Sequence, residues 1–360
     1  MIHRSLVFLI LLTLGSPPLV GLAAPRVQGE GGLIGRNLSQ AEAYLEPKLR
    51  SEYGSYFLSG RLRAITETDR TAARFEIRDS YLQLEKGNWR GRLGFQSLSW
   101  GETYGLFIAD LPNPRDWSDP RLLDIAYVKK PVFMAQLQWF GEWLGGASSL
   151  QLFFTPITRE QEISTDWSAA PSGTAEAAQE AEGGFRMTRL FDSGLDASAF
   201  VISHLDRTPS LSPGRVLSAG LTGTQALSDA WIFRTDQVWS RDTQWDWRGV
   251  AALQWSPEPS LFLVGQLQHD PRFLGASALV RYQGFAPGLD LDVFGLVGLD
   301  QRSTWLQPKI TYTRVDGLSF SLRYDWVDSS PRTLGGAQGT SFLETLPQAD
   351  RILLWISHRI

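Results

Sequence analysis

Arginine and carboxylate side chains alternate with apolar ones in several segments of this chain. Arg234 and Asp236 lie opposite Trp231 and Phe233 in a period of two, because neighbouring residues of a β-strand point to opposite faces. On this phase the polar faces carry both signs of charge: Arg61, Arg63, Arg74, Arg78, Arg92, Arg234, Arg248, Lys309 and Arg323, with Glu76, Asp236, Asp246, Asp290, Asp292 and Asp325. If these groups face a common interior, their opposite charges could create an electric field across it that orders water and polar solutes. Alternatively, they simply form ion pairs between adjacent strands.

A second group of candidate residues lies in one connection, between Trp100 and Asp116. Glu102, Asp110 and Asp116 are acidic, and Pro112 and Pro114 stiffen the backbone. A stiff acidic loop folded into a pore would narrow it and favour cations or polar neutral solutes. Alternatively, Trp100 only anchors the chain at a membrane interface, and Gly101, Asn113 and Pro114 only shape the loop.

Catalytic chemistry has little support in the sequence. The chain has four histidines and no cysteine, and it lacks a G-x-S-x-G elbow, an H-E-x-x-H pair and a phosphate-binding loop. Ser203 adjoins His204, but neighbours on a strand point apart and cannot cooperate. We therefore predict no catalytic residue, metal site, cofactor or enzymatic activity, and an outer-membrane hydrolase is a minor alternative.

The elements that must position these residues are long strands. Leu318–Trp326 and Trp245–Trp255 each alternate an apolar, aromatic-rich face with a polar one over about ten residues, where strands of soluble proteins average about five or six. Short and long connections also alternate. These features predict an all-β fold, a transmembrane antiparallel β-barrel of about 16 strands (14–18) over residues 53–360, with a lumen too wide to be filled by side chains.

The N-terminus predicts export. Residues 1–23 have a short basic start, an apolar run at 6–14 and small residues at the end, as in a signal peptide; a transmembrane anchor is the alternative. In the N-terminal segment 24–52, Ser39 and Glu42 have capping-box spacing, which predicts a short helix ending near Pro47 that could plug the lumen. A strand extension or a mobile tail is the competing interpretation.

The C-terminus and the charge suggest the partners. Ile352, Leu354, Ile356 and Ile360 share one face of a terminal strand, which is what barrel-assembly machinery recognises, although such strands usually end in Phe or Trp. We expect this machinery, outer-membrane lipid and lipopolysaccharide as partners in the cell outer membrane, and a homo-oligomer as a further expectation. The formal net charge of −4 gives no reason to expect nucleic acid.

The segment from Asp79 to Asp116 carries a resemblance. It contains DSYLQLEKGNWRGRLGFQSLSWGE followed by an N-P-x-D loop. This resembles a large group of uncharacterised proteobacterial porin-like outer-membrane proteins, and alginate-export-type porins share its strand-and-Gln part. The matching residues are Tyr81, Leu82, Leu93, Gly94, Gln96, Trp100, Gly101, Glu102, Asn113, Pro114 and Asp116. The group often has Arg before the Gln, where this chain has Phe95. The resemblance implies a porin-type barrel and leaves the substrate open.

Together these features predict an outer-membrane porin-like channel for passive passage of small polar solutes or ions. The alternative is a barrel that serves as a scaffold for a partner-dependent export or electron-transfer complex.

Overall fold

The computed structural model describes most of the chain after residue 25. In residues 26–78, and at 351, 355 and 357–359, it describes the backbone alone. The described ranges are 26–36, 40–50, 56–66, 71–104, 108–114, 129–143, 146–156, 181–205, 215–241, 244–271, 273–299, 303–314, 318–328 and 351–359.

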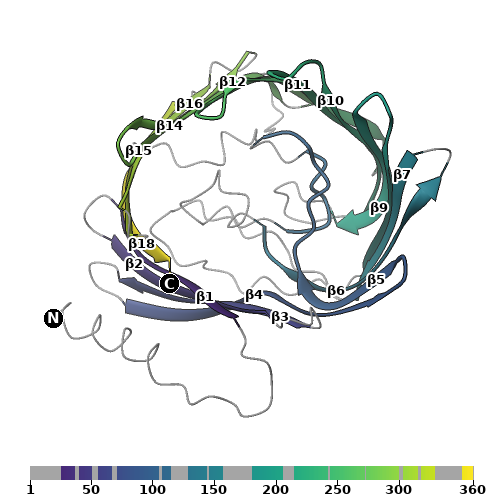
Figure 1. The fold of residues 1–360 in the computed structure, drawn as a ribbon, viewed down its shortest axis with the longest axis horizontal. Coiled ribbons are helices and arrows are strands. Elements are labelled where there is room, and N and C mark those ends of the chain that lie inside the picture. Colours follow the sequence, from purple (N-terminus) through teal and green to yellow (C-terminus); the bar gives the residue numbers. More distant parts are fainter. Residues whose placement is uncertain are drawn as a thin grey trace, which may run out of the picture.

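The described residues form 18 strands in a single sheet. Each strand pairs antiparallel with the next along the chain, and β1 pairs with β18, so the sheet closes into a barrel (Figure 1). The prediction of an antiparallel barrel with 14–18 strands is confirmed. The strands are β1 (Arg26–Arg36), β2 (Gln40–Arg50), β3 (Tyr56–Thr66), β4 (Thr71–Lys86), β5 (Trp89–Gln96), β6 (Val132–Trp143), β7 (Gly146–Thr155), β8 (Glu182–Leu190), β9 (Leu195–Leu205), β10 (Arg215–Ala226), β11 (Trp231–Arg241), β12 (Trp245–Glu258), β13 (Leu261–Asp270), β14 (Phe273–Ala286), β15 (Leu289–Gly298), β16 (Thr304–Thr313), β17 (Leu318–Asp328) and β18 (Arg351–Arg359).

The N-terminal segment differs from the prediction. The expected helix ending near Pro47 is wrong, because Gln40–Arg50 is strand β2, and the barrel begins at Arg26 rather than at residue 53. Strand β2 pairs with β1 along its whole length and with β3 on its other side. A helix here would leave the edges of β1 and β3 unpaired, which a membrane barrel cannot tolerate. The predicted signal peptide, residues 1–23, lies outside the described residues.

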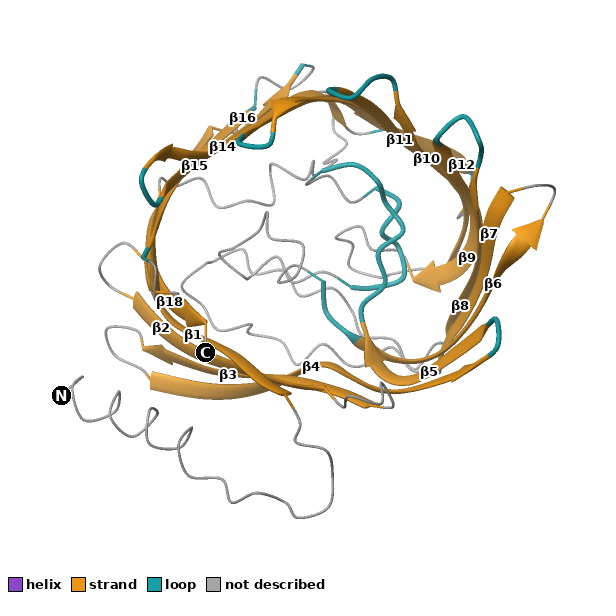
Figure 2. Ribbon diagram, viewed as in Figure 1, coloured by secondary structure: helices purple, strands orange, loops and turns teal. Residues whose placement is uncertain are grey.

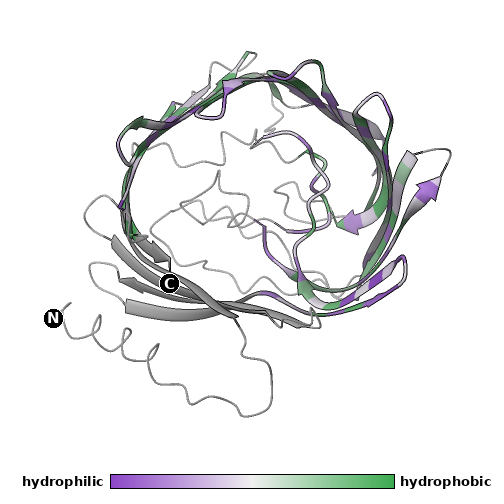
Figure 3. Ribbon diagram, in the orientation of Figure 1, coloured by the Kyte–Doolittle hydropathy of each residue, from purple (hydrophilic) through white to green (hydrophobic). Residues whose placement is uncertain are grey.

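The two faces of the strands are chemically distinct, as expected. On β17, Phe320, Tyr324 and Trp326 are exposed on the outer face, whereas Arg323 and Asp325 are buried on the inner face. Figure 3 shows the same alternation of hydropathy around the ring of strands. The large exposed side chains are therefore apolar and cover the outside, which is the inverse of a soluble protein and the arrangement that lipid requires.

The connections also fit a membrane barrel. Tight turns join β4 to β5, β12 to β13 and β14 to β15 at one end, and Gly87 and Gly288 adopt positive φ in two of them. Pro131 immediately precedes β6, so the strand begins where a proline can be tolerated. Among the described residues, no helix is long and apolar enough to cross a membrane.

The connection between β5 and β6 turns into the barrel. Its described parts, residues 97–104 and 108–114, are called the inward segment below. Figure 2 draws them as teal loops inside the ring of orange strands. For its described parts, the structure therefore has the inward fold that the sequence left as one of two alternatives.

Candidate functional site

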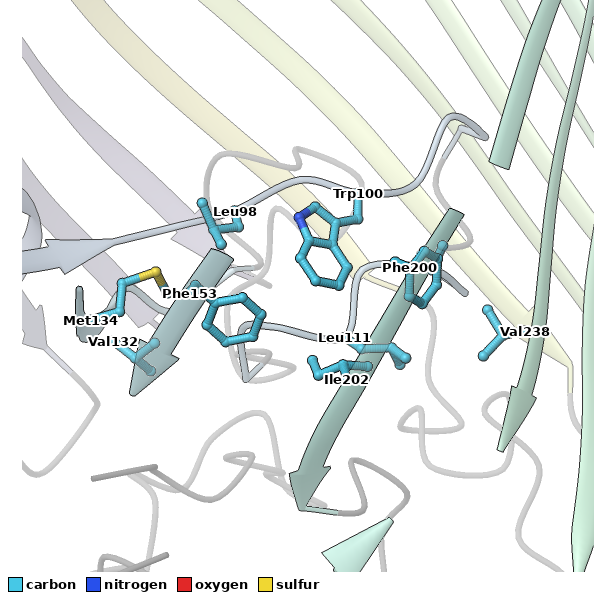
Figure 4. Packing of buried hydrophobic residues seen from close by; sticks show 10 residues of the cluster. Leu98, Trp100, Leu111, Val132, Met134, Phe153, Phe200, Ile202 and Val238 are labelled. Carbon is cyan, nitrogen blue, oxygen red and sulfur yellow. The ribbon is translucent and has the colours of Figure 1, made fainter. Parts of the chain in front are cut away.

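An apolar cluster fixes the inward segment to the barrel wall. The Trp100 side chain is completely buried, and its ring lies 5.4 Å from that of Phe153 on β7 and 5.1 Å from that of Phe200 on β9, between ring centroids. The Trp100 indole N–H donates to Gln151 Oε1 at 2.8 Å. Figure 4 shows Leu98, Trp100 and Leu111 of the segment against inward-facing side chains of four strands: Val132, Met134, Phe153, Phe200, Ile202 and Val238. The interpretation of Trp100 as a membrane-interface anchor is wrong, because β5 ends at Gln96 and the chain has already entered the lumen.

The tip of the inward segment is held by polar groups from the strands opposite. The carboxylate of Asp236 on β11 accepts the backbone N–H of Glu102 (2.9 Å), the N–H of Thr103 (3.2 Å) and the Thr103 hydroxyl (2.6 Å). Gln266 on β13 accepts the N–H of Tyr104 at 3.0 Å and donates to the Tyr104 carbonyl at 2.8 Å. Hydrogen bonds to a carboxylate are among the strong ones, so the main chain of the tip has a defined position.

Gly101 passes between two carboxylates. A Cβ at this position would lie 3.1 Å from Asp236 Oδ2 and 3.6 Å from Asp110 Oδ2. Asp110 accepts the N–H groups of Trp100 (2.6 Å) and Gly101 (3.1 Å), and pairs with Lys129 at 2.8 Å. Asp110 was predicted to add negative charge to the pore. Its side chain is only 5% exposed and holds the segment together instead.

Asn113 closes the base of the inward segment. Its Oδ1 accepts the Leu98 N–H at 2.6 Å, and its Nδ2 donates to the carbonyls of Gln96 (3.0 Å) and Lys130 (2.9 Å). The Pro114 carbonyl accepts the Lys130 N–H at 2.9 Å. The N-P pair therefore joins the two ends of the connection, in agreement with the interpretation that these residues shape the loop.

Gly94 and Gln96 of β5 belong to the same motif, which is the set of residues that match the porin-like group and is called the signature below. Gly94 has a φ of 136°, and a Cβ there would lie 2.3 Å from the Ser80 carbonyl oxygen, so no larger residue fits. Gln96 is buried and donates to the Met134 carbonyl at 3.1 Å. The signature thus specifies where the chain leaves the wall.

The Glu102 side chain points to residues of the barrel wall and does not bind the inward segment. Its Oε1 lies 3.3 Å from Arg186 Nη2 on β8, and its Oε2 lies 3.7 Å from Arg234 Nη1 on β11. Thr224 of β10 donates to Oε2 at 3.3 Å. The Glu102 side chain is 27% exposed, and it lies inside the barrel among side chains of β8, β10 and β11.

A basic pocket adjoins Glu102, because Arg186 borders both. The pocket has a volume of about 350 Å³ and lies between the base of the inward segment and the inner faces of β5 to β8. Among the described residues, its lining combines three arginines with mostly neutral polar side chains: Arg90, Arg92, Ser97, Leu98, Ser99, Gln136, Gln138, Ser149, Gln151, Arg186 and Thr188. Arg90 is paired with Glu85 at 2.6 Å, whereas Arg92 donates to a neutral partner, Gln83, at 2.6 Å. Such a lining suits an anionic or polar solute.

The remaining predicted arginines separate into two groups. Arg248 pairs with Asp270 at 3.0 Å, and Arg323 pairs with Asp325 at 3.1 Å, so these two belong to charge pairs in the wall. Arg234 donates to Gln254 and lies over the Tyr104 ring, next to Glu102. The side chains of Arg61, Arg63, Arg74 and Arg78, and the whole of Asp116, lie outside what the structure describes.

The sequence-based prediction missed Arg90 and Arg186. Arg186 alternates with the outward-facing Phe185 on β8, so the same period of two would have found it if Glu182–Leu190 had been recognised as a strand.

His204 is bonded to a serine other than its neighbour. Ser203 faces outward and accepts from Arg215, as the alternation predicts. His204 Nε2 lies 2.9 Å from Ser218 Oγ on β10, and its Nδ1 lies 2.6 Å from the Leu205 carbonyl oxygen. Ser218 is completely buried, so this pair fits a structural role in the wall better than nucleophilic attack.

Comparison with known proteins identifies the class of fold. No model of a protein family and no curated protein matches the sequence. Among solved structures, OpdQ of Pseudomonas aeruginosa is similar with a TM-score of 0.58 and 13% identity, over 93% of this chain and 97% of that one. OccK11 (OpdR) of the same organism gives 0.56 and 14%, over 93% and 95%, and OccAB2 of Acinetobacter baumannii gives 0.55 and 12%, over 93% and 96%. The chain therefore has the fold of outer-membrane porins.

Proposed function

We propose that this protein is an outer-membrane channel for the passive passage of small polar solutes that carry an anionic group. The observation that carries the proposal is the pocket that Arg90, Arg92 and Arg186 line on the inner wall of a porin-type barrel. The inward segment borders this pocket, so a solute passing there meets guanidinium groups and neutral hydrogen-bond donors. The acidic residues of the loop were a reason to expect cations. That reason is weaker, because Lys129 neutralises the charge of Asp110.

The outer surface supports a location in the outer membrane. Trp231 and Trp255 stack at 5.9 Å near the end of the barrel with the tight turns, and Trp239, Trp245 and Trp247 are exposed near the other end. Two aromatic girdles on either side of an apolar belt are typical of outer-membrane barrels. The predicted contacts with lipopolysaccharide, with barrel-assembly machinery and with further copies of the chain belong to this proposal.

The signature residues support a link to the uncharacterised porin-like group that they resemble. Gly94, Gln96, Trp100, Gly101 and Asn113 each fix the path of the inward segment. We propose that this group shares an inward segment held in the same way. A catalytic role is not part of the proposal.

Single-channel conductance in a planar bilayer tests the channel. Stable ohmic steps are expected from the purified, refolded barrel, and their absence from a correctly folded barrel would refute passive passage and favour a partner-dependent scaffold. Replacing Arg92 with glutamine should lower the anion-to-cation permeability ratio about fivefold, the effect of one unit charge about 4 Å from an ion in water. Arg241→Gln is the matched control, because Arg241 lies on the outer face over the Trp245 ring.

A further inference from the structure

The Glu102 carboxylate lies between two arginines that come from different strands. It contacts Arg186 of β8 at 3.3 Å and Arg234 of β11 at 3.7 Å, and both arginines are largely buried. Each arginine also has neutral partners: Arg186 donates to Ser198 at 2.9 Å, and Arg234 donates to Thr224 at 3.2 Å. The carboxylate is thus the anionic group that these two guanidinium groups share.

The contacts of Glu102 with these arginines are loose. Strong hydrogen bonds between a guanidinium group and a carboxylate have N–O distances of about 2.7–2.9 Å, which are shorter than both distances here. The Glu102 side chain is also 27% exposed, so water competes with the arginines for it. A better-placed external carboxylate could take its position.

The position of the main chain does not depend on the Glu102 side chain. The backbone of residues 102–104 is held by Asp236 and Gln266, and Trp100 anchors the preceding turn. The side chain can therefore leave the arginines while the inward segment stays in place. A purely structural role for the carboxylate would duplicate contacts that the segment already has.

We propose that Glu102 is a tethered anion that occupies the place of a solute carboxylate between Arg186 and Arg234, and that it determines specificity by competing with the solute. This rests on the proposed function. A solute with a carboxylate or phosphate group accepts hydrogen bonds from both arginines and displaces Glu102, which then turns to water. Weakly hydrogen-bonding anions such as chloride do not displace it.

The test is equilibrium binding of succinate to the purified, detergent-solubilised barrel, measured by titration calorimetry. Glu102→Gln keeps the size of the side chain and removes the competing charge, so the succinate Kd should fall about fivefold, as expected for one unit charge about 4 Å away in water. Glu258→Gln is the matched control, because Glu258 is exposed beside the tight turn between β12 and β13, and its Kd should equal that of the wild type. An unchanged or higher Kd in Glu102→Gln, or no succinate binding by either protein, would overturn the proposal.

A second variant keeps the proposal testable if Glu102→Gln does not fold, as judged by heat-modifiable migration on a gel. Arg234→Gln removes one of the two groups that receive the solute, so its succinate Kd should rise about fivefold. An unchanged Kd there would also overturn the proposal. Because binding is measured without conductance, a barrel that binds succinate as expected but gives no ohmic steps would refute only the proposed channel.

Discussion

Replacing Trp100 with alanine is expected to release the inward segment from the wall without opening the barrel. The indole is completely buried, packs against Phe153 and Phe200, and donates to Gln151. Truncation of a buried tryptophan costs about 3–5 kcal/mol. This cost falls on the docked segment, because the closed ladder of strands makes no use of Trp100.

The expected magnitude follows from this cost. A loss of about 3–5 kcal/mol raises the ratio of released to docked segment by roughly two to four orders of magnitude, since about 1.4 kcal/mol corresponds to a factor of ten. The contacts with Asp236 and Gln266 remain, so we expect a segment that exchanges between docked and released positions. In single-channel recordings, this exchange should appear as larger and noisier steps than those of the wild type.

Trp245→Ala is the matched control for this experiment. Trp245 is 56% exposed on the outer face, so its loss should leave the size and noise of the steps unchanged. Both variants should show the wild-type heat-modifiable migration, which reports a closed barrel. Wild-type steps from a folded Trp100→Ala barrel would refute the argument that Trp100 holds a constriction.

Two further predictions concern single positions. Gly101→Ala places a Cβ 3.1 Å from Asp236 Oδ2, so we expect it to destabilise the docked segment by about 1–3 kcal/mol and to increase channel noise. Gly91→Ala is the control, because its Cβ would have no atom within 4 Å, and equal noise in both variants would contradict this prediction. Leu253→Arg, on the outer face of β12, should cost about 2–4 kcal/mol in unfolding from lipid vesicles by guanidinium, and Leu227→Arg, in a turn, about 0–1 kcal/mol; equal costs would mean that Leu253 does not face lipid.

Local alternation was enough to predict the barrel. The period of two in Trp245–Trp255 and in Leu318–Trp326 predicted both the strands and the direction of their side chains, because consecutive residues of a strand must face opposite sides. A different rule, the capping-box spacing of Ser39 and Glu42, gave a wrong prediction at Gln40–Arg50. That segment is a strand because β1 and β3 need a partner between them. This requirement comes from closure of the sheet, and the local sequence pattern does not show it.

By itself, the sequence determined the class of fold, the mixed charge on the inner face and the importance of the segment around Trp100, Gly101 and Glu102. Only the tertiary structure decided where that segment goes. Glu102 meets Asp236 across 134 positions of the chain, and Trp100 meets Gln151 across 51. Such contacts depend on the register and closure of the whole barrel, which bring distant strands to one side of the lumen. The alternation along a strand tells which face a residue occupies, but it does not tell which residues lie across the interior. For that reason the pairing of Glu102 with Arg186 and Arg234 could not be predicted from the sequence.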